Sequence, residues 1–227
     1  MLGIIGAMDV EVNSLKNKVK NGKADVFANI EFISGDIEGI KVCVACCLPG
    51  KVNAALCTQL MIDKFDIDKI INVGIACSLS NEVVIGDIVV GDKLYQYDFD
   101  TSAVDGVKGL ILDGKTSIDA DYALSQALIK CAQNTGESVH YGGIATGDTF
   151  IASNELKKSI NEEFGAVCGE MEGGAIAQVC YINSIPFAVL RTISDGGNEE
   201  SQMAYPLFKE VAAKKSSEIM LNYLKNK

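Results

Sequence analysis

The sequence predicts an α/β protein in which a mixed sheet is covered by helices on both faces. The chain has 227 residues, 48% of them hydrophobic and 22% charged, so it can bury one sizeable core and is too apolar to be disordered. Short apolar runs alternate along it with longer segments of helical period. No repeat, linker or low-complexity tract interrupts this alternation. Residues 1–227 are therefore expected to form a single domain.

The N-terminal half is expected to contribute strands separated by two helices. Residues 2–6 are almost uniformly apolar, as in a buried strand, and Asp9 and Glu11 follow where the first turn of a helix favours carboxylates. Val52 and Leu60 belong to a helical repeat of apolar residues. We expect, in order, a strand at 2–6, a helix at 7–20, paired strands at 24–34 and 39–47 with a turn at Gly35-Asp36, a helix at 50–64, and strands at 69–74 and 83–91 with a bulge at Gly86-Asp87.

The C-terminal half is expected to alternate helices with core strands. Residues 98–117 carry glycines and aspartates without periodicity, which indicates a long loop. The expected elements are a helix at 119–133, a strand at 138–146, a helix at 154–163, a strand at 166–169, a helix at 173–183, a strand at 187–194, and a helix at 203–225 with Phe208, Ala212, Ile219 and Tyr223 on one face. Strand–helix order with an early hairpin-like insertion predicts a mixed sheet.

The charge balance excludes several classes of partner. Thirty acidic residues against twenty basic ones give a net charge of −10, which disfavours nucleic acid and anionic membranes. No apolar run approaches the ~20 residues of a transmembrane helix. The start MLGIIGAMDVEV lacks the basic region of a signal peptide. The sequence therefore predicts a cytoplasmic protein without nucleic-acid or membrane partners.

The chain has one histidine, His140, one arginine, Arg191, and eight cysteines. Metal sites built from several histidines are thereby excluded. Cys43 and Cys46 match C-x-x-C, but they lie in the apolar run KVCVACC, where cysteine behaves as a small hydrophobic residue. Zinc or redox chemistry there remains a minor alternative. We expect no metal and no cofactor, and cysteines that are reduced and packed in the core.

Four carboxylates follow predicted strands. Glu11 follows the first strand, Glu170 and Glu172 follow the strand at 166–169, and Asp195 follows the strand at 187–194. Ligands of open α/β sheets bind at the carboxyl ends of the strands. Carboxylates without histidine or metal spacing suit acid–base chemistry on a glycosidic bond, although each alone is also typical of a solvated helix start. Glycine-bearing turns lie beside them at 74–78, 146–150 and 195–197.

Seven motifs occur in one order along almost the whole chain: GIIGAMDVEV (3–12), PGKVNAAL (49–56), VGIACSL (73–79), VVIGDIVVGD (83–92), TGDTFI (146–151), GEMEGGAIAQVC (169–180) and RTISDGG (191–197). Together they resemble the 5′-methylthioadenosine/S-adenosylhomocysteine nucleosidases of the nucleoside phosphorylase superfamily. The resemblance implies a three-layer α/β/α sandwich around a central mixed, partly barrel-like sheet, usually as a homodimer. The dinucleotide motif G-x-G-x-x-G is absent.

The resemblance also implies a reaction. The family hydrolyses the N9–C1′ bond of 5′-methylthioadenosine and S-adenosylhomocysteine, and by extension 5′-deoxyadenosine, to adenine and the free 5-substituted ribose. Matching positions make Asp195 the general acid at N7 of adenine and Glu11 the base that activates water. Glu172 would bind the ribose hydroxyls.

Other roles carried over by the resemblance concern substrate binding. Glu170 is expected to be structural. The expected binding residues are Met8 and Met171 against the ribose, Phe150 stacked on adenine, Ile151 reading the base edge through its backbone, Ser194 orienting Asp195, and Arg191 in the network around the water.

Two departures from the family pattern leave open a hydrogen bond from the second glycine turn and the preferred 5′ substituent. Ile75 and Cys77 replace a serine and a glycine of the family's second glycine turn. The segment YDFDTSAVDGVKG at 97–109 lacks the aromatic and proline-rich stretch that helps to form the 5′ pocket across the dimer.

Three alternatives to this reading remain. A phosphorylase would need a phosphate clamp of several arginines, which one arginine disfavours. An aminodeoxyfutalosine-type nucleosidase shares the adenine chemistry. A non-catalytic nucleoside-binding or storage protein is disfavoured because binding alone does not require both an acid and a base.

Overall fold

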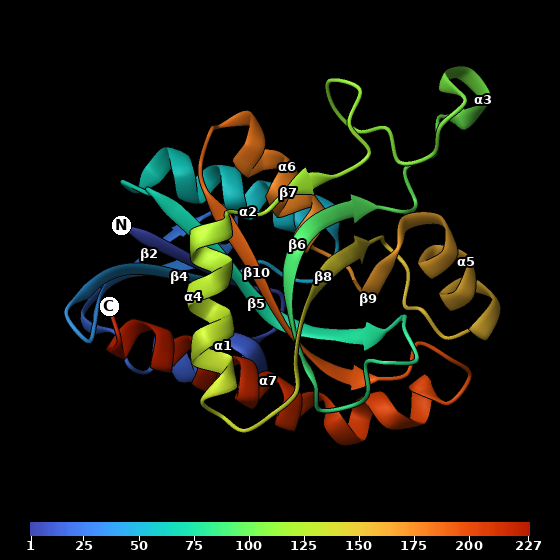
Figure 1. The fold of residues 1–227 in the computed structure, drawn as a ribbon. Helices are drawn as coiled ribbons and strands as arrows, with labels where there is room; N and C mark the ends of the chain where they lie inside the picture. Colours follow the sequence, from blue (N-terminus) through green and yellow to red (C-terminus); the bar gives the residue numbers. More distant parts are fainter.

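The computed structural model describes residues 1–227 and consists of one strongly twisted sheet with helices on both faces (Figure 1). The strands are β1 (Leu2–Gly6), β2 (Lys20–Phe27), β3 (Ile30–Ile37), β4 (Ile40–Cys46), β5 (Lys69–Ser78), β6 (Ile88–Gln96), β7 (Ile118–Asp119), β8 (Val139–Thr146), β9 (Ala166–Glu170) and β10 (Phe187–Asp195). The helices are α1 (Asp9–Lys16), α2 (Lys51–Lys64), α3 (Ser102–Asp105), α4 (Tyr122–Gln133), α5 (Asn154–Phe164), α6 (Gly173–Ile182) and α7 (Ser201–Lys225).

The sheet is mixed and partly closed into a barrel. Its strand order is β10-β6-β8-β9-β5-β1-β4-β3-β2, and β10 also pairs with β5, so five strands form a ring. Strand β1 runs parallel to both β4 and β5, and β10 runs parallel to β5, whereas β9 meets β5 antiparallel. The expected mixed, partly barrel-like sheet is thereby confirmed.

Helices cover the two faces of the sheet as separate groups, which confirms the three layers. Helices α2 and α6 pack together on one face, and α1 and α4 each pack against α7 on the other (Figure 1). Alternating strand residues divide between the two cores: Ile5 belongs to the α2–α6 side and Ile4 to the α1–α7 side. This alternation is the period of two that buries both faces of a central strand.

The segment at 20–47 differs from the prediction. It forms three strands, joined by two-residue turns at Ala28-Asn29 and Glu38-Gly39, all four residues having positive φ between 50° and 81°. Turns of this kind match the twist of hairpins. Gly35 lies inside β3 and not in a turn. The position requires glycine because a Cβ there would stand 2.6 Å from the carbonyl oxygen of Lys20.

Some element boundaries also differ. The first helix ends at Lys16, β5 continues to Ser78, and β6 begins at Ile88, so the pair Gly86-Asp87 forms a turn before β6 and not a bulge within it. In the last helix Ala212, Ile219 and Tyr223 are buried as expected, but Phe208 is exposed. The long loop at 98–117 contains the short helix α3.

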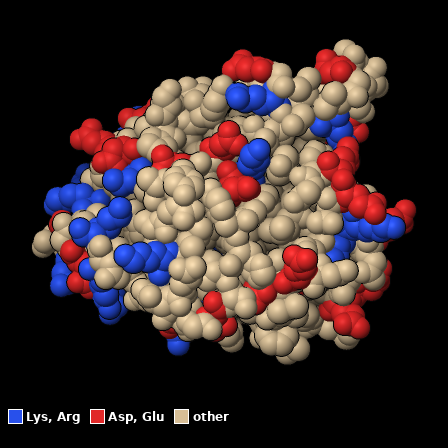
Figure 2. Space-filling view, viewed as in Figure 1, with Lys and Arg blue, Asp and Glu red and all other residues tan.

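The charged side chains are unevenly distributed over the surface, and the cysteines are unpaired and mostly buried. Lysines gather over the β2–β4 side of the molecule on the face shown in Figure 2, and acidic side chains are more frequent toward α5. All eight cysteines are free. Burial raises the pKa of the Cys43 thiol to about 12, consistent with a cysteine packed in the core. No helix combines the length and the apolar character that crossing a membrane requires.

Candidate active site

An open cavity, about 580 Å³ when the solvent at its mouth is included, lies where β1, β5, β9 and β10 end. Parallel pairing brings the ends of β1, β5 and β10 to one edge, and β9 reaches the same place because Gly169 pairs with Cys77 near the end of β5. The cavity brings together eight of the nine predicted site residues: Met8, Glu11, Phe150, Ile151, Met171, Glu172, Ser194 and Asp195.

Glu11 is held by the turn between β1 and α1. Its Oε2 accepts hydrogen bonds from the backbone N–H groups of Ala7 at 2.7 Å and Met8 at 2.9 Å, and its Oε1 from that of Ile75 at 3.1 Å. Burial raises the pKa of Glu11, while the charge of Arg191 and these three bonds oppose the rise. The bond from position 75 comes from the backbone, so it does not depend on the serine hydroxyl that Ile75 lacks.

Gly74 on β5 allows two charged groups to approach the strand. A Cβ at this position would stand 2.7 Å from Oε1 of Glu11 and 3.2 Å from Nη1 of Arg191. A side chain would therefore push the carboxylate and the guanidinium apart.

Glu172 stands at the N-terminus of α6 and faces the start of another helix. Its Oε1 accepts a 2.8 Å hydrogen bond from the N–H of Gly50, the residue before α2. Burial first, and the nearby charge of Glu170 second, raise the pKa of Glu172 to about 8, against the opposing effect of Arg191. Glu172 therefore holds its proton more firmly than an ordinary glutamate.

Asp195 ends β10 and is almost fully buried. Its Oδ2 lies 2.9 Å from Oγ of Ser194, and its Oδ1 accepts a 3.1 Å hydrogen bond from the N–H of Gly197. The Ser194 hydroxyl also lies 3.3 Å from the carbonyl oxygen of Ala76. Because a hydroxyl both donates and accepts, Ser194 can satisfy Asp195 in either protonation state.

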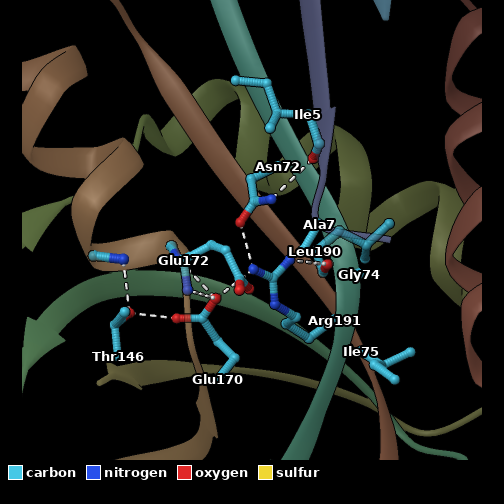
Figure 3. A network of polar contacts seen from close by, with 12 residues as sticks. Ile5, Ala7, Asn72, Gly74, Ile75, Thr146, Glu170, Glu172, Leu190 and Arg191 are labelled. Carbon is cyan, nitrogen blue, oxygen red and sulfur yellow. Dashed lines mark hydrogen bonds and ion pairs between the residues drawn. The ribbon is translucent and has the colours of Figure 1, made fainter. Parts of the chain in front are cut away.

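Arg191 is the predicted site residue that the cavity does not include. Its side chain is 1% exposed, and Nη2 donates to Glu170 and to Asn72 behind the cavity wall (Figure 3). The guanidinium is thus occupied within the protein, and its influence on the cavity is electrostatic. No lysine or arginine lines the cavity.

Several lining residues were not predicted from the sequence. Tyr205 on α7 packs edge-to-face on Phe150 with ring centroids 5.4 Å apart, and its hydroxyl lies 3.3 Å from the sulfur of Met8. Nothing in the local sequence distinguishes Tyr205 from a packing residue, because its role depends on where α7 begins. Cys77 lines the cavity beside the equally buried Ile151.

Comparisons with known proteins agree with this architecture. A family model described as the phosphorylase superfamily matches residues 1–225. The 5′-methylthioadenosine/S-adenosylhomocysteine nucleosidase of Bacillus velezensis is 35% identical over 230 residues, covering 99% of this chain and 98% of that protein. The enzyme of the same name from Staphylococcus aureus strain JH9 is 36% identical over 219 residues, covering 96% of each.

Solved structures show the same similarity. The nucleosidase of Neisseria meningitidis in complex with methylthio-immucillin-A superposes with a TM-score of 0.95 and 31% identity, covering 100% of this chain and 99% of that one. A futalosine hydrolase of Helicobacter pylori gives a TM-score of 0.95 at 32% identity, covering 100% and 97%. The chain belongs to the phosphorylase superfamily and, within it, to the 5′-methylthioadenosine/S-adenosylhomocysteine nucleosidases.

Proposed function

We propose that the protein hydrolyses the N-glycosidic bond of 5′-methylthioadenosine and S-adenosylhomocysteine, and of 5′-deoxyadenosine, releasing adenine and the free 5-substituted ribose. The observation that carries this proposal is the convergence of Glu11, Glu172 and Asp195 on one cavity that no cation lines. An acid, a base and an anion beside the sugar are what cleavage through a cationic, oxocarbenium-like transition state needs.

Asp195 is assigned the role of general acid. Adenine leaves readily only when the electrons of the broken N9–C1′ bond are neutralised by a proton at N7. The Asp195 carboxyl would deliver that proton, and its burial and its contacts with Ser194 and the N–H of Gly197 support this role. The same carboxyl would accept a hydrogen bond from the 6-amino group.

Glu11 and Glu172 are assigned the sugar side of the reaction. Glu11, whose pKa burial raises, would deprotonate the attacking water, because a raised pKa makes a carboxylate a stronger base. Glu172 would accept hydrogen bonds from the ribose hydroxyls and, once ionised, stabilise the positive charge that develops on the sugar. Met8 and Met171 would pack against the ribose.

The base would be held by Phe150 and Ile151. Phe150 is partly exposed at the cavity and already packs edge-to-face on Tyr205, which orients its ring for stacking on a purine. Ile151 is buried, and its backbone N–H and C=O pair with no other group of the chain. Buried backbone groups are rarely left unpaired, so this pair is suited to the N1 and 6-amino edge of adenine.

Adenine release should proceed at full rate in phosphate-free buffer, and the sugar product should be the free pentose. The reason is that the one arginine is bound to Glu170 and Asn72, which leaves no cation in the cavity to clamp phosphate. Chromatography of the products from 5′-methylthioadenosine, with and without phosphate, is the measurement. Strict dependence on phosphate, with a sugar 1-phosphate as product, would contradict hydrolysis.

A second candidate function is an aminodeoxyfutalosine-type nucleosidase. The similarity to the futalosine hydrolase of Helicobacter pylori and the divergent segment at 97–109 favour it. It uses the same adenine chemistry and differs in the 5′ group. Initial rates of adenine release from a panel of 5′-substituted adenine nucleosides rank the two candidates directly.

We also propose that the protein works as a homodimer in the cytoplasm. Val52 on α2 and Val104 in α3 are 79% and 88% exposed, and a second copy that packs on these elements would cover them. Eight free cysteines suit a reducing compartment.

A further inference from the structure

Glu170 is the fourth carboxylate at the cavity, and four donors occupy its two oxygens. Oε1 accepts from the hydroxyl of Thr146, and Oε2 accepts from the N–H groups of Glu172 at 3.0 Å and Gly173 at 2.7 Å and from Nη2 of Arg191 (Figure 3). With its oxygens filled in this way, Glu170 is not free to bind a substrate or to transfer a proton.

These bonds fix the start of α6. Thr146 Oγ1 accepts from the N–H of Gly174 at 2.7 Å, so Thr146 and Glu170 together satisfy the first three N–H groups at the helix end. Cβ atoms at Gly173 and Gly174 would stand 3.2 Å from Glu170 oxygens and 2.9 Å from Thr146. The glycines therefore let the helix start lie against the two side chains. The position of Glu172 follows from this arrangement.

Arg191 connects the start of α6 with the strand that precedes Glu11. Its Nη2 donates both to Glu170 and to Oδ1 of Asn72 on β5, and Nδ2 of Asn72 donates to the carbonyl oxygen of Ile5 on β1 at 2.9 Å. The buried guanidinium therefore links four strands. Arg191 itself lies on β10, and it contacts Glu170 on β9 and Asn72 on β5, which in turn contacts β1.

One buried cation therefore serves three buried carboxyls. Arg191 is in direct contact with Glu170, whereas it reaches Glu11 only across the gap left by Gly74. If all three carboxyls were ionised, the cluster would carry an excess of negative charge in a region with little water. Such a cluster relieves the excess by keeping protons on the carboxyls that are not paired.

We propose that Glu170 is a positioning residue which, by pairing with Arg191, withholds the buried cation from Glu11 and Glu172 and so leaves those two carboxyls able to exchange protons. The inference rests on the proposed function, in which Glu11 takes a proton from water. Burial raises the pKa of Glu11 and of Glu172, and Glu170 adds to the rise at Glu172. A base whose proton affinity lies near the working pH transfers protons most effectively.

Other titratable groups also face these two carboxyls. They are Asp195 on β10, Tyr205 on α7, and the thiols of Cys46 and Cys47 at the end of β4. Burial raises the pKa of both thiols and of the Tyr205 phenol, so these three groups stay uncharged at neutral pH. Glu170 and Arg191 are therefore the partners whose charge can be altered without touching the proposed acid.

The test is Glu170→Gln, which keeps the shape and one of the two acceptor oxygens but removes the negative charge. Arg191 then acts in full on Glu11 and Glu172, and an opposite charge lowers the pKa of a carboxyl. The acid limb of kcat/KM against pH should move to lower pH by about one unit, with a plateau reduced by roughly 10- to 100-fold because the base is weaker. An unmoved limb would overturn the proposal, even if the rate fell.

Two further variants separate charge from structure. Thr146→Val removes the hydroxyl that donates to Glu170 and accepts from the N–H of Gly174, without changing any charge. It should lower the thermal midpoint while leaving the acid limb in place. Asn72→Asp places a second carboxylate on the guanidinium and removes the hydrogen bond that Nδ2 donates to the carbonyl oxygen of Ile5. Its added charge should move the limb in the opposite direction, to higher pH. Movement in the same direction for Glu170→Gln and Asn72→Asp would show that the shifts come from disruption and not from charge.

The inference can be tested apart from activity. In protein with ¹³C-labelled glutamate carboxyls, NMR titration of the wild type and of Glu170→Gln should show the raised carboxyl titrations moving to lower pH in the variant. If the wild type releases no adenine from any nucleoside, the proposed function fails, and this titration still decides the role of Glu170. Identical titrations in the two proteins would reject that role.

Discussion

Asp195→Asn and Glu11→Gln should each lower kcat for adenine release by about 10²- to 10⁴-fold, the usual contribution of a positioned acid or base. Both replacements keep the shape and acceptor oxygen of the side chain. The amide introduced by Asp195→Asn could still accept from the N–H of Gly197, yet neither variant could transfer the proton that its role requires. Initial rates with 5′-methylthioadenosine provide the measurement, and the Kd of an uncleavable analogue should change far less.

A matched control for these variants lies on the same turn as Glu11. Asp9 is also a carboxylate in the first turn of α1, but it is exposed and does not line the cavity. Asp9→Asn should retain near-normal kcat. Near-normal kcat in Asp195→Asn or Glu11→Gln would show that the role given to that residue is wrong.

Methylthioadenosine should be cleaved at least ~10²-fold faster, in kcat/KM, than methylthioinosine. The inosine base carries an acceptor oxygen at C6 and a proton on N1, so the contacts proposed for Asp195 and for the Ile151 backbone are both mismatched. Each mismatched buried polar group costs about 1–3 kcal/mol. Rates for this pair, which share the 5′ group, isolate recognition of the base. Comparable kcat/KM values would mean that these two residues do not read the 6-position.

The fold was predictable where one periodicity dominated a segment. Helix α2 and strands β8 and β9 lie within a residue or so of the ranges expected from apolar spacing. The hairpins at 20–46 were not predictable in detail, because their turns use Ala28-Asn29 and Glu38-Gly39 with positive φ in place of the usual Asn-Gly or Asp-Gly signal. We expected a turn at Gly35, but this glycine lies within a strand, where it permits close packing.

The carboxylates of the site were predictable because each follows a strand, and strand ends converge at one edge of the sheet. The partners of Arg191 were not predictable from the sequence. They are Glu170 and Asn72, which contact the guanidinium because of how β9, β10 and β5 pair in the sheet. The place of Tyr205 depends on how α7 crosses the cavity, which is a tertiary property that its own neighbours in sequence do not encode.

The burial of Glu172 also affects how firmly the chain stays folded. In the unfolded chain this carboxyl has its ordinary pKa of 4.5, whereas the fold raises that pKa to about 8. The folded state therefore binds the proton more tightly, and the stability gained from it is complete below pH 4.5 and is lost as the pH rises toward 8. At mildly alkaline pH the ionised, buried Glu172 of the ligand-free protein therefore lowers the free energy of unfolding. Ribose hydroxyls that donate to the ionised Glu172 would offset this loss, so a bound nucleoside would protect the fold most where the ligand-free protein is least stable.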